Sequence, residues 1–210
     1  MRGAKEWVRV SDHTRTRVGA VQVLWKCPFS DGQYVSECAW EGAVLDNCPF
    51  HPEGGCGVEK LGTYPRVEPP GALIPRFWCP REGASISLLP SFLAARFRGT
   101  LDSVEDAVAA VELAGSIEAA VDTVHPPDVE APLGFEAAVR SIHRRVVAVH
   151  TVLLALVTLL PEHFTGVAPT LVGFRERLGP GRILLRAREL AERHLRALSA
   201  PFGFRPRGST

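Results

Sequence analysis

The chain has 210 residues, of which 46% are hydrophobic and 22% are charged, so it can bury a core in one or two domains. Its formal net charge of +1 excludes a partner chosen by overall charge alone. Residues 1–10 are mixed and charged, and five cysteines are an odd number, so neither a secretory signal nor a closed disulfide framework is expected. We therefore expect a cytoplasmic protein.

The charges are unevenly distributed along the chain. Residues 1–100 carry a net charge of +2, and residues 101–134 carry −8 with no basic residue. Residues 135–210 carry +7, from 12 arginines and 5 glutamates. Such an asymmetry indicates either a face that binds nucleic acid or an acidic segment that binds a basic partner.

The first part of the chain is predicted to be rich in β-structure. Residues 19–25 alternate partly between apolar and polar side chains, and residues 33–40 could pair with them across the turn-forming run at 27–32. Cys27 and Cys38 have no nearby His or Cys to complete a site of their own. We expect them to be core cysteines, with a supporting metal role as the alternative.

Four side chains that can bind a metal fall within 32 residues. Cys48 and His51 have the two-residue gap of a metal knuckle, Cys56 follows among glycines, and Cys79 comes later. One imidazole and three thiolates make an acceptable tetrahedral shell for Zn²⁺. The alternatives are a loop with buried, unmetallated cysteines, or a disulfide.

The residues between these ligands predict a hairpin. Residues 60–66 and 73–78 could be two strands, joined through a turn that contains two prolines and a glycine. A knuckle, a hairpin and a returning cysteine are typical of a zinc ribbon, in which the metal substitutes for a core that so few residues cannot form. We predict such a ribbon at about residues 44–93.

The exit from the predicted ribbon resembles a known family. Arg76-Phe77-Trp78-Cys79-Pro80, the run Ser-Leu-Leu-Pro-Ser-Phe-Leu at 87–93 and Arg96-Phe97-Arg98 look like the zinc-ribbon domain of bacterial transposable-element proteins, over roughly residues 44–145. In that family a helix-turn-helix follows the ribbon. The chain departs from the family after Cys79, where a further Cys or His is usual near Gly83, and Cys56 takes that place here. The resemblance implies association with a mobile element and DNA binding.

Helical patterns follow the ribbon. Asp102 or Ser103 is expected to cap a helix that ends at Gly115, and a second helix follows over 117–124. Two short helices and a third further on have the outline of a helix-turn-helix over 103–145. An ordinary helical hairpin would give the same pattern.

The third helix is predicted over 135–160. Its second half, 146–160, is nearly all apolar, and we expect it, Leu154 included, to be covered by the C-terminal part or by a second copy in a homodimer. About 15 apolar residues are too few for a membrane span. The first half carries three arginines from which a recognition helix could contact DNA: Arg140, Arg144 and Arg145.

The last predicted helix, over 182–198, is strongly amphipathic. Its apolar residues fall on one side, and the opposite sector could be either a solvated face or a ridge that follows phosphates, because guanidinium groups suit phosphate oxygens. That sector contains Glu189 and four arginines: Arg182, Arg186, Arg193 and Arg196.

We therefore expect an α+β chain with a β-rich, zinc-ribbon domain over 1–99 and an all-helical domain over 100–210. The phosphate-binding Gly-Lys-Ser/Thr loop, the Gly-x-Ser-x-Gly elbow and the His-Glu-x-x-His motif are missing, so no enzyme is expected. The expected function is a non-catalytic DNA-binding accessory or regulatory protein of a bacterial mobile element, acting on double-stranded DNA, with a separate recombinase as a further partner.

The alternative function is a zinc-clipped helical scaffold for protein–protein interaction that does not bind nucleic acid. The two functions differ in where the arginines lie. Arginines on one continuous basic face favour DNA, whereas arginines paired with the acidic residues of 102–130 favour the scaffold.

Overall fold

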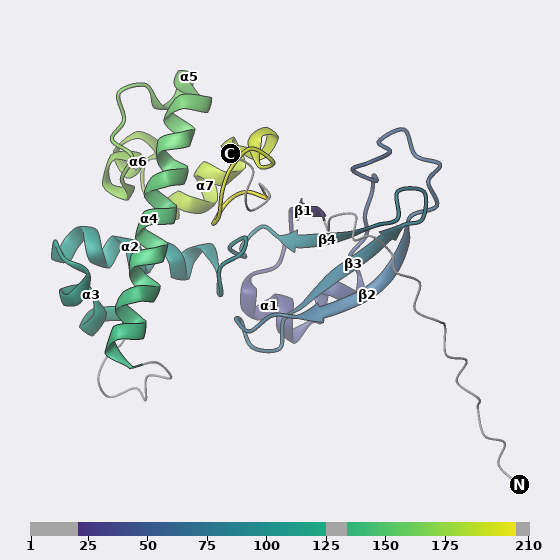
Figure 1. The fold of residues 1–210 in the computed structure, drawn as a ribbon, viewed down its shortest axis with the longest axis horizontal. Helices are drawn as coiled ribbons and strands as arrows, with labels where there is room; N and C mark the ends of the chain where they lie inside the picture. Colours follow the sequence, from purple (N-terminus) through teal and green to yellow (C-terminus); the bar gives the residue numbers. More distant parts are fainter. Residues whose placement is uncertain (1–20, 125–133, 205–210) are drawn as a thin grey trace, which may run out of the picture.

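The computed structural model of the chain describes residues 21–124 and 134–204, and it has a sheet-containing part followed by a helical part (Figure 1). The predicted α+β class is therefore confirmed. The strands lie in one four-stranded sheet, and six α-helices of the described residues come after it.

The strands of the sheet lie in the order β1-β4-β3-β2. β1 (Val21–Trp25) runs parallel to β4 (Ala84–Pro90), and β3 (Leu73–Cys79) is antiparallel to both β4 and β2 (Glu59–Pro65). The β2–β3 pair is the hairpin predicted from the sequence, which is confirmed. The Ser-Leu-Leu-Pro run expected to lead out of the ribbon instead begins inside β4, one of the two central strands.

The predicted pairing of residues 19–25 with residues 33–40 is wrong. Ser30 begins a helix through a capping box, because its hydroxyl accepts a hydrogen bond from Gln33 N while its own N–H donates to Gln33 Oε1. The backbone groups of this segment are thereby used within a helix, so β1 pairs with β4 instead. The segment forms a helix and a 3₁₀ turn: α1 (Asp31–Ser36) and η1 (Ala39–Glu41).

The helical part begins directly after the segment 91–100. Thr100, rather than Asp102 or Ser103, is the cap of its first helix, since Ser103 N donates to Thr100 Oγ1 at 3.0 Å. The predicted long helix is confirmed and ends before Pro161. The helices are α2 (Leu101–Ala114), α3 (Ile117–Val124), α4 (Phe135–Leu159), α5 (Pro161–Phe164), α6 (Leu171–Leu178) and α7 (Ile183–Leu190).

The last helix is shorter than predicted. α7 ends at Leu190, and a 3₁₀ turn, η2 (Glu192–His194), changes the direction of the chain. The change lets Leu195 and Phe202 enter the same buried cluster as the apolar face of α7.

One face of α4 forms the centre of the helical core. Val149, Val152 and Leu156 are fully buried against residues of α2, α6 and α7. By length and composition α4 is also apolar enough to cross a membrane, so the argument from length against a span does not hold. The core helix of a soluble protein meets the same criterion, but only 28% of the apolar window of α4 is buried, so one face of the helix is covered and much of it is exposed.

The acidic residues of α2 bind the C-terminal helices. Glu105 is buried, and its Oε2 accepts a hydrogen bond from Leu184 N at 2.8 Å, in the first turn of α7. Glu112 accepts hydrogen bonds from Leu171 N (2.8 Å) and Val172 N (3.1 Å) in the first turn of α6. A carboxylate at a helix N-terminus satisfies N–H groups and the helix dipole. Part of the charge asymmetry seen in the sequence is therefore matched inside the molecule.

Replacing Glu105 by Ala is expected to lower the free energy of unfolding by about 2–4 kcal/mol, because a buried charge-assisted hydrogen bond is lost and Leu184 N is left unpaired. Urea unfolding followed by circular dichroism measures the change. Glu118→Ala, at an exposed position of α3, is the control and should change stability by less than about 0.5 kcal/mol. Equal stability of the two variants would contradict the role assigned to Glu105.

The segment between β4 and α2 connects the two parts through backbone carbonyls. Arg66 Nη2 donates to Ala94 O (2.9 Å) and Phe97 O (2.7 Å) from the sheet side. From the helical side, Arg188 Nη1 donates to Leu93 O at 2.7 Å. The segment therefore contacts both the sheet side and the helical side. The domain boundary predicted between residues 99 and 100 stays a prediction.

Candidate metal centre

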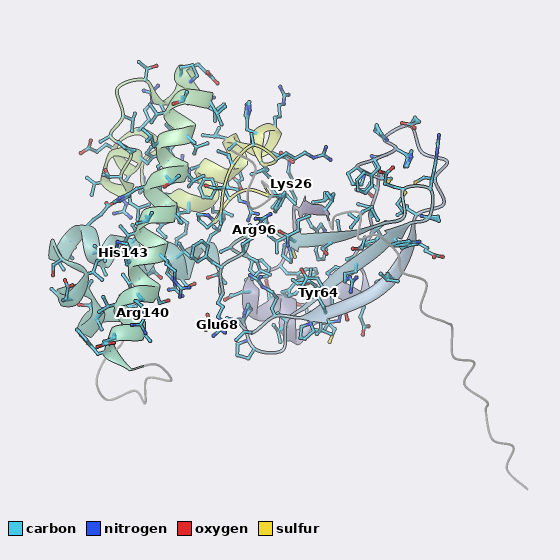
Figure 2. All side chains as sticks on the ribbon, viewed as in Figure 1. Lys26, Tyr64, Glu68, Arg96, Arg140 and His143 are labelled. Carbon is cyan, nitrogen blue, oxygen red and sulfur yellow. The ribbon has the colours of Figure 1, made fainter. Side chains whose placement is uncertain are left out.

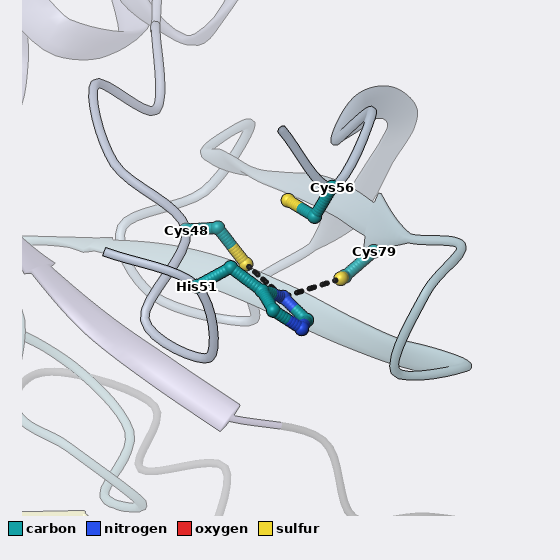
Figure 3. A group of neighbouring side chains, drawn as sticks. All are labelled: Cys48, His51, Cys56 and Cys79. Carbon is teal, nitrogen blue, oxygen red and sulfur yellow. Dashed lines mark hydrogen bonds between the residues drawn. The ribbon is translucent and has the colours of Figure 1, made fainter. Parts of the chain in front are cut away.

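The four predicted ligands come from three places in the sheet-containing part. Cys48 and His51 lie on one tight turn (Figure 3). A hydrogen bond from His51 N to Cys48 O at 3.1 Å closes this turn. Cys56 lies on the loop before β2, and Cys79 is the last residue of β3. The loop needs its glycines, because Gly54 and Gly55 both have positive φ, which favours residues without a Cβ.

The side chains of these residues point toward one another (Figure 3). His51 Nδ1 lies 3.5 Å from Cys79 Sγ and 3.8 Å from Cys48 Sγ, and all four ligand atoms are within 4.8 Å of one another. Zn–S and Zn–N bond lengths with tetrahedral angles would put N and S about 3.6 Å apart. The geometry and the donor set therefore fit a zinc ion, and the group could hold a metal.

The site is buried between one face of the sheet and the loops that carry Cys48, His51 and Cys56. Cys79 is fully buried and His51 is 9% exposed, so the site has little direct contact with solvent. The thiols pack with Phe77 and Ile86, which lie on one face of the sheet. A polar cluster in such a place is costly unless its groups are satisfied, and a metal ion would satisfy all four at once.

The acidity of the thiols differs within the group. Burial opposes the thiolate form of Cys48, but hydrogen bonds from His51 and from nearby backbone N–H groups outweigh it and lower its pKa to about 7. Burial raises the pKa of Cys56, and the neighbouring thiols add to the effect. A bound cation would favour the thiolate form of each ligand, because only the thiolate binds the metal.

The other two cysteines lie outside this group. Cys38 is exposed and has a positive φ of 49°, so its prediction as a core cysteine is wrong. It follows α1 at the point where the backbone turns into η1, which leaves the side chain in solvent. Cys27 was also predicted to be a core cysteine, and it is half-buried and packs at the edge of the cluster around Tyr34.

The predicted DNA-contacting arginines have different surroundings. Arg140 and Arg144 are exposed on the first half of α4, where Figure 2 shows Arg140 near His143. Arg145 is half-buried, and burial lowers the pKa of its guanidinium. Arg182 forms ion pairs with two residues of α2, Asp102 at 3.3 Å and Asp106.

The remaining two members of the set are exposed. Arg186 Nη1 donates to Pro180 O at 3.0 Å, and Arg193 lies in η2, where the chain has left the predicted helix. Arg182 and Arg193 are therefore not on one continuous helical ridge as predicted. The spacing of the arginines in the sequence could not predict which of them form ion pairs and which are exposed.

Sequence reasoning missed one charged residue of the core. Arg188 of α7 is 1% exposed, and its Nε and Nη2 have no hydrogen-bond partner among the described residues. Burial lowers the pKa of this guanidinium to about 9. On a helical projection Arg188 falls at the border of the apolar side of α7, which is the signal that could have found it.

Comparison with known proteins finds no family model, curated protein or solved structure that matches this chain.

Proposed function

We propose that the chain is a non-catalytic DNA-binding accessory protein of a bacterial mobile element, stabilised by a zinc ion. Cys48, His51, Cys56 and Cys79 would hold the ion. The resemblance of residues 44–145 to transposable-element proteins supports the mobile-element context, and the β2–β3 hairpin between the ligands agrees with a zinc ribbon.

A structural role for the ion follows from the number of ligands. A catalytic zinc site keeps one position open for water or substrate, whereas structural sites are closed by four protein ligands. Here three thiolates and one imidazole converge, and all four residues are buried. The ion is therefore expected to stabilise the sheet-containing part and not to take part in a reaction.

The observation that carries DNA binding is the exposure of Arg140 and Arg144. They lie one turn apart on α4, and the only carboxylate recorded next to either among the described residues is Glu136, 3.4 Å from Arg140 and itself exposed. Such a surface ion pair is weak and can be exchanged for a phosphate. In the proposed helix-turn-helix of α2, α3 and α4, these positions would face the DNA.

The scaffold function is a second candidate, favoured by a different observation. Arg182 is engaged by Asp102 and Asp106, and Arg175 lies 3.6 Å from Glu105, so part of the basic C-terminal segment is bound to α2. The exposed residues Val147 and Leu154 of α4 would then contact a protein, including a second copy of the chain.

A salt titration separates the two functions. The full-length zinc-loaded chain should bind a mixed-sequence DNA duplex more weakly as salt rises, with each neutralised phosphate adding about −0.9 to the slope of log K against log salt. The double variant Arg140→Ala/Arg144→Ala should bind more weakly and flatten the slope by up to about two units. Fluorescence anisotropy with a labelled duplex measures both quantities.

The control variant is Arg177→Ala, which removes an exposed arginine of α6 that donates to His163 O. It should leave the slope within the error of the wild type. Arg140 contributes little to folding through its pair with Glu136, about 0.3–0.5 kcal/mol, so the double variant should stay folded. Absence of duplex binding at about 50 mM salt would reject the DNA function and leave the scaffold.

A further inference from the structure

A cleft of about 630 Å³ lies between the sheet and the C-terminal segment. Of the residues considered from the sequence for phosphate or metal binding, Arg196 lines it, and the other described ones do not. Figure 2 shows Arg96 at the junction of the two parts and Tyr64 on β2. The cleft is lined by aromatic, hydroxyl, amide and guanidinium side chains and by one valine. The lining residues are Val21, Gln22, Phe50, Tyr64, Arg76, Ser85, Ser87, Arg96, Arg196 and Phe204.

A polar row across the sheet forms the floor of the cleft. Gln22 of β1 is paired with Ser87 of β4, and Ser87 is paired with Arg76 of β3. Cross-strand partners share one face of a sheet, so the three side chains stand side by side. The adjacent residues Phe77 and Ile86 point to the opposite face, where they pack with the metal-binding cysteines. Because side chains alternate along β3 and β4, the cleft lies on one face of the sheet and the group of cysteines on the other.

The cleft has three positive charges and no carboxylate among its described lining residues. Arg96 donates one Nη2 bond to Phe204 O (3.3 Å) and Arg196 one to Pro49 O (3.5 Å), which orients both guanidinium groups and leaves most of their N–H donors available. Arg76 has no hydrogen-bond or ion-pair partner in the described part of the chain. Three guanidinium groups of this kind are suited to the oxygens of a phosphate.

A fourth positive charge lies behind one wall. The guanidinium of buried Arg188 is 5.8 Å from the ring centroid of Phe204, which lines the cleft. Its Nε and Nη2 lack hydrogen-bond partners among the described residues, and it is in no recorded ion pair. A buried positive charge without a counter-charge raises the local electrostatic potential. An anion in the neighbouring cleft would therefore lower the free energy cost of burying the Arg188 guanidinium.

The cleft also offers surfaces for a flat apolar group. Phe50, Tyr64 and Phe204 can stack on an aromatic ring, and the amide of Gln22 and the hydroxyl of Ser85 can form hydrogen bonds with its edge. Its volume falls within the range of about 300–1,000 Å³ found for small-molecule sites. We propose that this cleft binds a nucleoside phosphate, as a free nucleotide or as the terminal nucleotide of a single strand, with Arg76, Arg96 and Arg196 holding the phosphate.

This site is separate from the duplex-binding residues proposed on α4, so the two can be tested independently. Isothermal titration calorimetry of the full-length zinc-loaded chain should detect binding of deoxyadenosine monophosphate, with a Kd below about 1 mM. Inorganic phosphate and deoxyadenosine should each bind at least about tenfold more weakly, because each lacks half of the contacts. A 5′-phosphorylated short oligonucleotide that binds better than the mononucleotide would identify a strand end as the source. Equal affinity would identify a free nucleotide.

Arg76→Met and Arg196→Met should each weaken binding of deoxyadenosine monophosphate by about tenfold or more, since each removes a charge-assisted hydrogen bond. The matched control is Arg98→Met, an exposed arginine that does not line the cleft, and its effect should be less than about twofold. Zinc content and circular dichroism of every variant establish that it is folded. A second control, Arg140→Ala/Arg144→Ala, should leave nucleotide binding unchanged even if it abolishes duplex binding.

Three results would overturn the proposal. The first is wild-type protein that does not bind deoxyadenosine monophosphate at millimolar concentration. The second is binding that survives both cleft substitutions in folded protein. The third is an equal loss of nucleotide and duplex binding in Arg76→Met, because this would make the cleft a part of the duplex surface. Loss of duplex binding by the α4 variant alone bears on the proposed function and not on the cleft.

Discussion

Replacing Cys79 by Ser is expected to abolish the proposed binding of zinc and to unfold the region around the β2–β3 hairpin. Cys79 is fully buried at the end of β3, and its sulfur lies 3.5 Å from the ring nitrogen of His51. Structural zinc contributes about 10–16 kcal/mol of apparent binding free energy in small zinc domains, whereas whole domains are stable by only about 5–15 kcal/mol. Elemental analysis and hydrogen exchange of the hairpin amides measure the two effects.

Cys38→Ser is the matched control, because Cys38 is exposed and lies outside the metal-binding group. This variant should keep about one zinc ion per chain and the exchange protection of the wild type. Removing the metal from the wild type with a chelator should reproduce the effect of Cys79→Ser. Wild-type protein purified without chelator that contains no zinc would show that the ligands are a packed thiol cluster instead.

The convergence of the four candidate ligands and the hairpin could be predicted because their signals are local. Cys48 and His51 have the spacing of one tight turn, and the glycines before Cys56 allow the loop to return toward β2. The register of the β2–β3 hairpin then brings Cys79 back to the same end of the sheet. A short loop and a hairpin leave few alternative arrangements, so spacing was sufficient here.

The first strand could not be placed from the sequence. Its partner is β4, and Val21 pairs with Ile86 far along the chain, so no turn between neighbouring strands signals the contact. The segment beside it did carry a local signal that we read wrongly. Ser30 and Gln33 have the spacing of a capping box, which begins a helix and argues against the strand predicted over 33–40.

Charge counts along the sequence overstated the surface charge of the C-terminal part. Glu105 and Glu112 are two turns apart on one face of α2, and each caps a different later helix. Asp102 and Asp106 form ion pairs with the side chain of Arg182. The sum over a segment cannot show which charges meet inside the molecule, whereas the one-turn spacing of acids on α2 was a visible hint of a shared partner.

Introducing Leu153→Asp is expected to prevent the helical part from folding and to produce insoluble protein. Leu153 is fully buried in the cluster formed by α2, α4, α6 and α7. The substitution removes buried apolar volume, which costs about 2–5 kcal/mol, and places a carboxylate within a cluster of apolar side chains. The total exceeds about 4 kcal/mol, a large share of the stability of an ordinary domain. Soluble yield and near-ultraviolet circular dichroism measure the loss.

The next residue provides a matched control. Leu154 was predicted to be covered by the C-terminal part or by a second copy, and the C-terminal part does not cover it, because it is 57% exposed within the chain. Successive residues of a helix point about 100° apart, so the covered face of α4 includes Leu153 and not Leu154. Leu154→Asp should therefore give folded, soluble protein with stability changed by less than about 1 kcal/mol in the monomer. If Leu154 lies in the homodimer seam considered for residues 146–160, the same variant should stay folded but sediment as a monomer where the wild type sediments as a dimer. Insoluble Leu154→Asp together with soluble Leu153→Asp would show that α4 is rotated about its axis relative to the structure described.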